Sequence, residues 1–171
     1  VDVPIAGLPD ALHGYTIAQI SDIHVGPTIK RGYLNAIVTK VNALKPDAIA
    51  ITGDLVDGSV PRLALHTAPL ERLSARDGTF FVTGNHEYYA GLGRALAFTK
   101  EAGFTLLRGT AVSSGAINIA GVDDPAGVQM KIDKPASEKT LLSKLPKGFF
   151  VSVDTRRSLT VSLPPPGTSM A

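Results

Sequence analysis

Cysteine is absent from this chain of 171 residues, which excludes disulfide bonds and thiolate metal ligands. The chain also lacks a large excess of positive or negative charge, since it has 17 Lys and Arg and 15 Asp and Glu. The basic residues do not form a stripe on any one element. This balance leaves no nucleic-acid-binding footprint. No apolar run approaches the roughly 18 to 20 residues that span a bilayer, and no signal peptide is visible. The chain opens at Val1 without an initiator Met, so its compartment and any membrane association stay open.

Short apolar runs alternate along the chain with segments of helical spacing. The runs have the length of buried strands, and the other segments repeat apolar residues three to four positions apart. The predicted strands are 15–21, 48–52, 80–83, 105–107 and 117–122, and the predicted helices are 34–44, 63–73, 92–102 and 138–144. This order predicts one α/β layered fold with parallel strands, long enough to bury a substantial core.

Three polar motifs directly follow the first three predicted strands. They read D-x-H at 22–24, G-D-x-x-D at 53–57 and G-N-H-E at 84–87. In open α/β sheets, ligand sites form at the carboxyl ends of the strands. Carboxylate, amide and imidazole groups converging there suit divalent metals such as Mn, Zn or Fe. The motifs therefore predict a metal site built without thiolates.

In this order, the motifs resemble the signature of the calcineurin-like metallophosphoesterase family. Segments 21–26, 84–89 and 120–124 are similar to a bacterial phosphodiesterase branch of it. The resemblance implies a two-sheet β-sandwich flanked by helices. It also implies hydrolysis of phosphate esters, diesters in particular, by hydroxide that a pair of metal ions generates near neutral pH. The chain has neither the G-x-S-x-G motif of a nucleophilic serine nor a dinucleotide-binding G-x-G-x-x-G after its first strand.

The resemblance assigns metal ligands residue by residue. Asp22 and His24 are expected to hold the first metal and Asn85 the second, with the Asp54 carboxylate bridging the two. His86 is expected to stabilise the charge of the phosphate and to help protonate the leaving oxygen rather than bind metal.

Two carboxylates are expected to lie behind the ligands. Asp57 and Glu87 would orient the ligands or the imidazole of His86. Asp57 is equally well explained as a helix N-cap, so both interpretations stay open. Tyr88 and Tyr89 either line a substrate pocket or pack as aromatic residues.

Several other polar residues are predicted to be structural. Asp123 and Asp124 precede Pro125, which is typical of a turn. His13 and His66 are expected to face solvent.

The resemblance covers residues 1 to about 150 and then stops. The family pattern continues with further histidines, which complete the coordination of both metals, whereas the last histidine here is His86. Two bound ions, one ion or an empty site therefore all stay open for this chain. This difference predicts a fold whose second half is incomplete, ending in an atypical tail at 151–171. Segments 149–153 and 158–163 alternate apolar and polar residues and form a predicted hairpin.

An incomplete fold exposes a sheet face and a strand edge, which self-association would cover. We therefore expect a homo-oligomer. The interface candidates are apolar residues of the tail: Val151, Val153, Leu159, Val161 and Leu163. The alternative to a functioning enzyme is a weakly active or inactive remnant that self-assembles.

Overall fold

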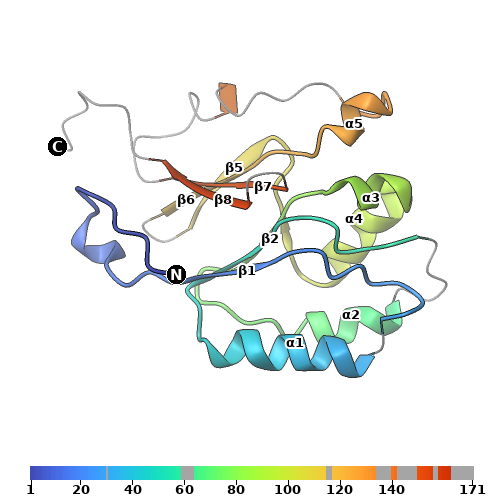
Figure 1. The fold of residues 1–171 in the computed structure, drawn as a ribbon, viewed down its shortest axis with the longest axis horizontal. Helices are drawn as coiled ribbons and strands as arrows, with labels where there is room; N and C mark the ends of the chain where they lie inside the picture. The colour runs from blue at the N-terminus through green and yellow to red at the C-terminus, as the bar shows by residue number, and fades with distance from the viewer. Residues whose placement is uncertain are drawn as a thin grey trace.

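The computed structural model describes residues 1–29, 31–58, 64–114, 117–133, 140–141, 150–155 and 158–162. Two four-stranded sheets form a sandwich, and helices α1 and α2 cover the outer face of the first sheet (Figure 1). The strands are β1 (Ile17–Ile20), β2 (Ala48–Ile51), β3 (Thr79–Phe81), β4 (Thr105–Leu106), β5 (Thr110–Ser114), β6 (Ile117–Gly121), β7 (Phe150–Asp154) and β8 (Ser158–Ser162). The helices are η1 (Asp10–Leu12), α1 (Arg31–Ala43), α2 (Ala64–Leu70), α3 (Asn85–Tyr89), α4 (Leu92–Glu101) and α5 (Ala126–Gln129).

The first sheet is parallel throughout, in the order β1-β2-β3-β4. Its second strand, β2, is buried along its whole length because layers cover both faces of the sheet. Ile49 and Ile51 belong to the core under the helices, together with Phe98 of α4. Ala48 and Ala50 belong to the core between the two sheets. The strand thus divides its side chains between two cores with the period of two that strand geometry imposes.

The second sheet has the order β5-β6-β7-β8, with β6 and β7 parallel and the outer pairs antiparallel. Ile119 of β6 and Val153 of β7 pack in one core with Phe80 of β3 and with Val82, which directly follows β3. This shared core joins the sheets into the predicted sandwich. The predicted α/β layered fold is therefore confirmed.

The predicted elements lie close to those of the structure, with differences where the sequence signal is short. Helix α2 ends at Leu70, earlier than predicted, and contains Pro69. The elements that the sequence did not predict are η1, α3, β5 and α5, each of five residues or fewer, too short to show a period. The predicted helix at 138–144 lies largely outside the described residues. Among the helices that are described, none is long and apolar enough to cross a membrane.

The two segments predicted as a hairpin pair antiparallel as β7 and β8. However, Val151 and Val153 are wrong as interface candidates, because both are buried within the chain, in the core between the sheets. Their apolar alternation marks the face of β7 that packs on the first sheet. The side chains of Leu159 and Val161, and the whole of Leu163, lie outside the described part of the chain.

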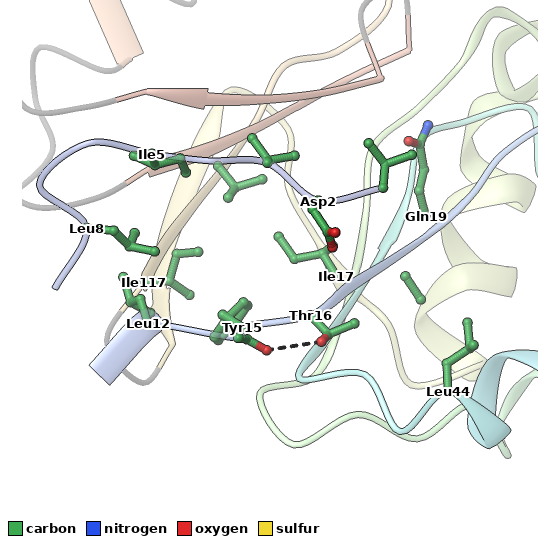
Figure 2. Close-up of a pocket in the computed structure, with 15 residues that line it drawn as sticks. Asp2, Ile5, Leu8, Leu12, Tyr15, Thr16, Ile17, Gln19, Leu44 and Ile117 are labelled. Atoms are coloured by element: carbon green, nitrogen blue, oxygen red, sulfur yellow. Dashed lines mark hydrogen bonds between the residues drawn. The ribbon is translucent and has the colours of Figure 1, made fainter. Parts of the chain in front are cut away.

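A hollow of about 820 Å³ lies along β1, between this strand and the N-terminal segment (Figure 2). Its walls are mainly apolar and include Ile5, Leu8, Ile17 and Ile117. Within the described residues β1 pairs only with β2, so the other edge of the strand is open. An open strand edge beside an apolar hollow can accept another strand.

The burial of β7 predicts that its valines stabilise the single chain. We expect Val153→Ala to lower the free energy of unfolding by about 2 kcal/mol, because it removes buried methyl groups and leaves a cavity. Val128→Ala is the matched control, since Val128 is 37% exposed and Val153 is 0% exposed. Urea unfolding followed by circular dichroism measures both. Equal stabilities of the two variants would contradict the position of β7 in the core.

Candidate metal centre

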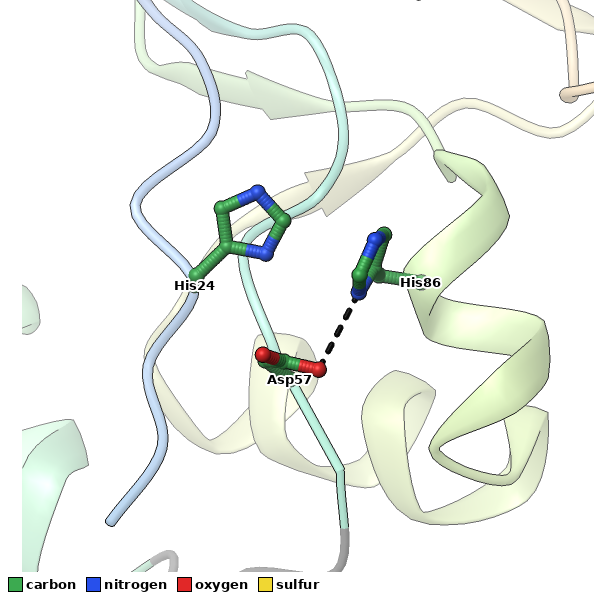
Figure 3. Close-up of side chains that lie close together, drawn as sticks. All are labelled: His24, Asp57 and His86. Atoms are coloured by element: carbon green, nitrogen blue, oxygen red, sulfur yellow. Dashed lines mark hydrogen bonds and ion pairs between the residues drawn. The ribbon is translucent and has the colours of Figure 1, made fainter. Parts of the chain in front are cut away.

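The three motifs meet at the carboxyl ends of β1, β2 and β3, which are neighbours in the first sheet. Asp22 and His24 follow β1, Asp54 and Asp57 follow β2, and His86 lies in α3 after β3. Figure 3 shows His24, Asp57 and His86 converging from these three segments. The parallel order of the strands brings the motifs together, as expected for an open α/β sheet.

The first two loops run side by side with an unusual backbone. Asp22, His24 and Asp54 all have positive φ, at 55°, 51° and 50°. A left-handed conformation costs a residue with a Cβ roughly 1–2 kcal/mol, so it persists only where other contacts hold it. Here the amide of His24 donates to the carbonyl of Asp54 at 3.0 Å, and the amide of Val25 donates to the carbonyl of Leu55 at 2.7 Å. These bonds turn the predicted ligands toward one another.

Two glycines allow the second and third loops to touch. A Cβ on Gly53, where φ is 92°, would lie 2.5 Å from the amide nitrogen of Gly84. A Cβ on Gly84 would lie 2.2 Å from a carboxylate oxygen of Asp54. Any side chain at either position would therefore separate Asp54 from α3. Both glycines are therefore required for the contact between the two loops.

Glu87 joins the same two loops through its buried carboxylate. One carboxylate oxygen accepts hydrogen bonds from the amides of Leu55 and Val56 at 2.8 and 3.0 Å, and the other accepts from those of Asp54 and Gly84 at 3.0 and 2.7 Å. The side chain is 0% exposed. Burial raises the pKa of Glu87, while the hydrogen bonds from the amides of Val56, Gly84 and Asp54 act against that shift. Glu87 thus orients Asp54 through the backbone.

Two overlapping groups of side chains have the composition of a metal site. Asp22, His24 and Asp54 form one group, and His24, Asp57 and His86 form the other, with the potential ligand atoms of each group within 4.8 Å of one another. The carboxylate of Asp54 also accepts a hydrogen bond from the amide of His86 at 3.0 Å. Both groups share His24, so the two potential ion positions would be adjacent.

His24 supplies the observation that fits a metal best. Its Nδ1 is buried and has no hydrogen-bond partner among the described residues. A buried polar atom without a partner costs free energy, and coordination of a metal would remove that cost. Carboxylate oxygens and neutral imidazole nitrogens are also the donors that Mn, Zn and Fe accept in proteins. The residues present therefore fit a divalent metal.

His86 is held over this centre by a carboxylate and two rings. Its Nδ1 lies 3.1 Å from an oxygen of Asp57. An ionised carboxylate only accepts hydrogen bonds, so Nδ1 carries the hydrogen and Nε2 is left for other contacts. The His24 ring packs edge-on against His86 with centroids 4.4 Å apart, and the Tyr89 ring packs at 5.7 Å. Asp57 thus contacts the predicted catalytic histidine, in line with an orienting role.

The structure distinguishes Tyr88 from Tyr89, whose roles the sequence left undecided. Tyr88 is buried, whereas Tyr89 is 64% exposed beside His86. Asn85 begins α3 next to the other motif residues and is half-buried, and its role as a ligand stays a prediction.

The polar residues predicted as structural have their own contacts. Asp124 accepts a hydrogen bond from the amide of Ala126 at 2.8 Å, as a turn requires. Asp123 accepts from Thr83 and from the guanidinium of Arg108, a pairing that no local sequence pattern predicts.

The two histidines predicted to face solvent, His13 and His66, differ in their exposure. His13 is exposed as predicted. His66 is half-buried in α2 and its Nδ1 is shielded from solvent, so its side chain is only partly exposed.

The buried carboxylate of Glu87 yields a stability prediction. Glu87→Gln replaces one acceptor oxygen by an amide –NH₂, and this leaves the two backbone amides that donated to that oxygen unpaired. Because each unpaired buried donor costs roughly 1–3 kcal/mol, we expect a loss of about 3 kcal/mol in the free energy of unfolding. Glu101→Gln, at an exposed position of α4, is the control and should change little. Urea unfolding of both variants provides the measurement, and equal midpoints would contradict the role of Glu87.

Comparison with known proteins agrees with this geometry. A family model described as calcineurin-like phosphoesterase matches residues 15–146. An uncharacterized metallophosphoesterase of Aquifex aeolicus is 40% identical over 115 residues, which cover 67% of this chain and 44% of the relative. One from Helicobacter pylori is 39% identical over 108 residues, 63% of this chain and 29% of the relative. A Danio rerio protein named transmembrane protein with metallophosphoesterase domain is 46% identical over 89 residues, 52% of this chain and 20% of the relative.

In each of these three relatives, the matched region spans less than half of the relative's length. The family model, in contrast, covers most of this chain and all three motifs of the metal centre. The family binds divalent metals, and the structure brings candidate ligand groups together. This chain belongs to the calcineurin-like phosphoesterase family.

Proposed function

We propose that this chain hydrolyses phosphate esters with the help of divalent metal ions, and that diesters are its preferred substrates. The observation that carries the proposal is the convergence of Asp22, His24 and Asp54 within 4.8 Å at the carboxyl ends of adjacent parallel strands. The family match and the names of the relatives support the reaction class. The preference for diesters rests on the resemblance of the motifs to a bacterial phosphodiesterase branch.

The metal would be held by the ligands that the motifs supply. Asp22 and His24 would bind one ion and Asn85 a second, with the carboxylate of Asp54 between them. Bound there, the ions would supply positive charge against the phosphate oxygens and a water-derived nucleophile near neutral pH. The donors are oxygen and imidazole nitrogen without thiolate, which favours Mn, Zn or Fe. We propose Mn²⁺ as the metal for the first hydrolysis assays.

His86 would act on the leaving group. Its hydrogen bond from Nδ1 to Asp57 fixes the ring, so that Nε2 is the nitrogen available to the substrate. For this role the ring would carry hydrogens on both nitrogens. The imidazolium Nε2–H would donate a hydrogen bond to a phosphate oxygen and then pass that proton to the departing oxygen, leaving neutral imidazole with its Nδ1–H on Asp57. Asp57 would stabilise the ring in that orientation, and it would not touch the substrate itself.

A direct test is hydrolysis of bis-p-nitrophenyl phosphate with and without Mn²⁺. We expect metal-stimulated turnover in the wild type, a fall to background in Asp54→Ala and a loss of about 10²- to 10⁴-fold in His86→Ala, the range for a general acid. His13→Ala is the matched control, because this histidine is exposed and belongs to neither candidate ligand group. p-Nitrophenyl phosphate tests the preference for diesters.

The results separate the parts of the proposal. Turnover that does not depend on Mn²⁺, or that is retained in Asp54→Ala, would contradict the metal-dependent mechanism. Faster hydrolysis of the monoester would contradict only the preference for diesters.

A self-assembling form with little activity is the second candidate. The observation in its favour is the open edge of β1 beside an apolar hollow, which a second copy of the chain could cover. We expect the chain to elute as a homo-oligomer in gel filtration with light scattering, and Ile17→Lys to shift it toward monomer. A monomeric wild type at micromolar concentration would contradict self-association.

A further inference from the structure

A cluster of polar side chains lies behind α3, outside the metal centre. The guanidinium of Arg108 contacts Asp123 through Nε at 2.9 Å, and it also pairs with the carboxylate of Asp133. The hydroxyl of Tyr88 donates to Asp133, and that of Thr83 donates to Asp123 at 2.8 Å. Arg108 also reaches the Tyr88 hydroxyl at 3.4 Å. We call these five residues the Arg108 cluster.

The cluster is largely shielded from water. The side chains of Arg108, Asp123 and Asp133 are 23%, 15% and 21% exposed, and Tyr88 is 3% exposed. Charges in such surroundings are stable only when each has its partners, so removal of one partner disturbs the others. Burial and the hydrogen bond to Asp133 raise the pKa of Tyr88 to about 12, so the hydroxyl keeps its proton at neutral pH. The cluster therefore favours a single arrangement.

The cluster reaches the metal centre through α3. This helix has only five residues, too few to be stable without tertiary contacts. Tyr88 follows His86 by two positions, which places the two side chains roughly 200° apart around the helix. One face of α3 therefore carries His86 toward the metal centre, while the opposite face carries Tyr88 into the Arg108 cluster.

The packing of the Tyr88 ring leaves α3 little freedom to rotate. The ring lies against Gly127 of α5, where a Cβ would come within 2.6 Å of ring atoms. Thr83, immediately before the G-N-H-E motif, is held by its bond to Asp123 and by the Thr155 hydroxyl, which donates to its carbonyl at 2.9 Å. Contacts from Thr155, directly after β7, and from the loop after β6 thus hold the residue that precedes the motif of α3.

We propose that the Arg108 cluster positions His86 for catalysis by setting the rotation of α3. The proposal rests on the function proposed above for His86. Arg108 and Tyr88 are positioning residues, since they act through the helix and do not touch the substrate. Their effect should appear in the chemical step, because a misplacement of about 1 Å at a reacting group can cost on the order of 10²-fold in rate.

The first experiment is a double-mutant cycle between Tyr88→Phe and His86→Ala, with diester hydrolysis as the readout. Tyr88→Phe removes only the hydroxyl, and we expect kcat to fall about tenfold with KM unchanged. In the His86→Ala background the same change should cost less than about twofold. Equal losses in both backgrounds would overturn the proposal, because the hydroxyl would then act independently of His86.

The matched control is Tyr15→Phe. The Tyr15 hydroxyl also donates to an aspartate, Asp77, at 2.7 Å, but it lies just before β1, away from the carboxyl ends of the strands. We expect both variants to lower the melting temperature, and only Tyr88→Phe to lower kcat. Arg108→Lys keeps the positive charge but not the planar guanidinium with its several hydrogen-bond donors. It should therefore retain part of the activity that Arg108→Ala loses.

A second readout needs no turnover. The rings of His24 and His86 have centroids 4.4 Å apart, close enough for a nuclear Overhauser effect between their protons. We expect this effect in the wild type and in Tyr15→Phe, and its weakening in Tyr88→Phe. An unchanged effect in Tyr88→Phe, or its absence in the wild type, would overturn the proposal. An inactive wild type would contradict the proposed function alone, and this measurement would still decide the role of the cluster.

Discussion

The geometry of the candidate metal centre depends on one buried carboxylate, that of Glu87, which accepts hydrogen bonds from four backbone amides. Three of these amides belong to the loop after β2, and the fourth belongs to Gly84 in the loop after β3. A single side chain therefore fixes the distance between Asp54 and the start of α3. Without this carboxylate, the four backbone amides would be buried without an acceptor, because the two loops are packed too tightly for another group to replace it.

Other features of the site follow from this contact. The two glycines are needed because the loops approach within the space of a Cβ. The positive φ of Asp54 is tolerated because the amides on both sides of its Cα, its own and that of Leu55, donate hydrogen bonds to Glu87. Behind α3, the Arg108 cluster adds a second anchor on the face opposite His86. Backbone strain in the loops is thus offset by polar contacts that lie away from the ligands themselves.

The sequence predicted that the three motifs converge, because each motif follows an apolar run and the ends of parallel strands meet. It could not predict how Glu87 works, since that depends on the distance between two loops. It left Tyr88 and Tyr89 undecided, because a five-residue helix shows no period that would identify its buried face. Val151 and Val153 were assigned to an interface because alternation marks an apolar face without showing what covers it. The Arg108–Asp133 pair joins residues 25 positions apart, beyond any local pattern.

If the three motifs form one metal centre, substoichiometric Mn²⁺ should broaden the amide signals of a ¹⁵N-labelled chain selectively. We expect loss of signals from residues 22–24, 54–57 and 85–87, retention of those of α1 and β5, and recovery of the lost signals in Asp54→Asn. Broadening centred elsewhere, or broadening unchanged in Asp54→Asn, would show that the motifs do not form one metal centre.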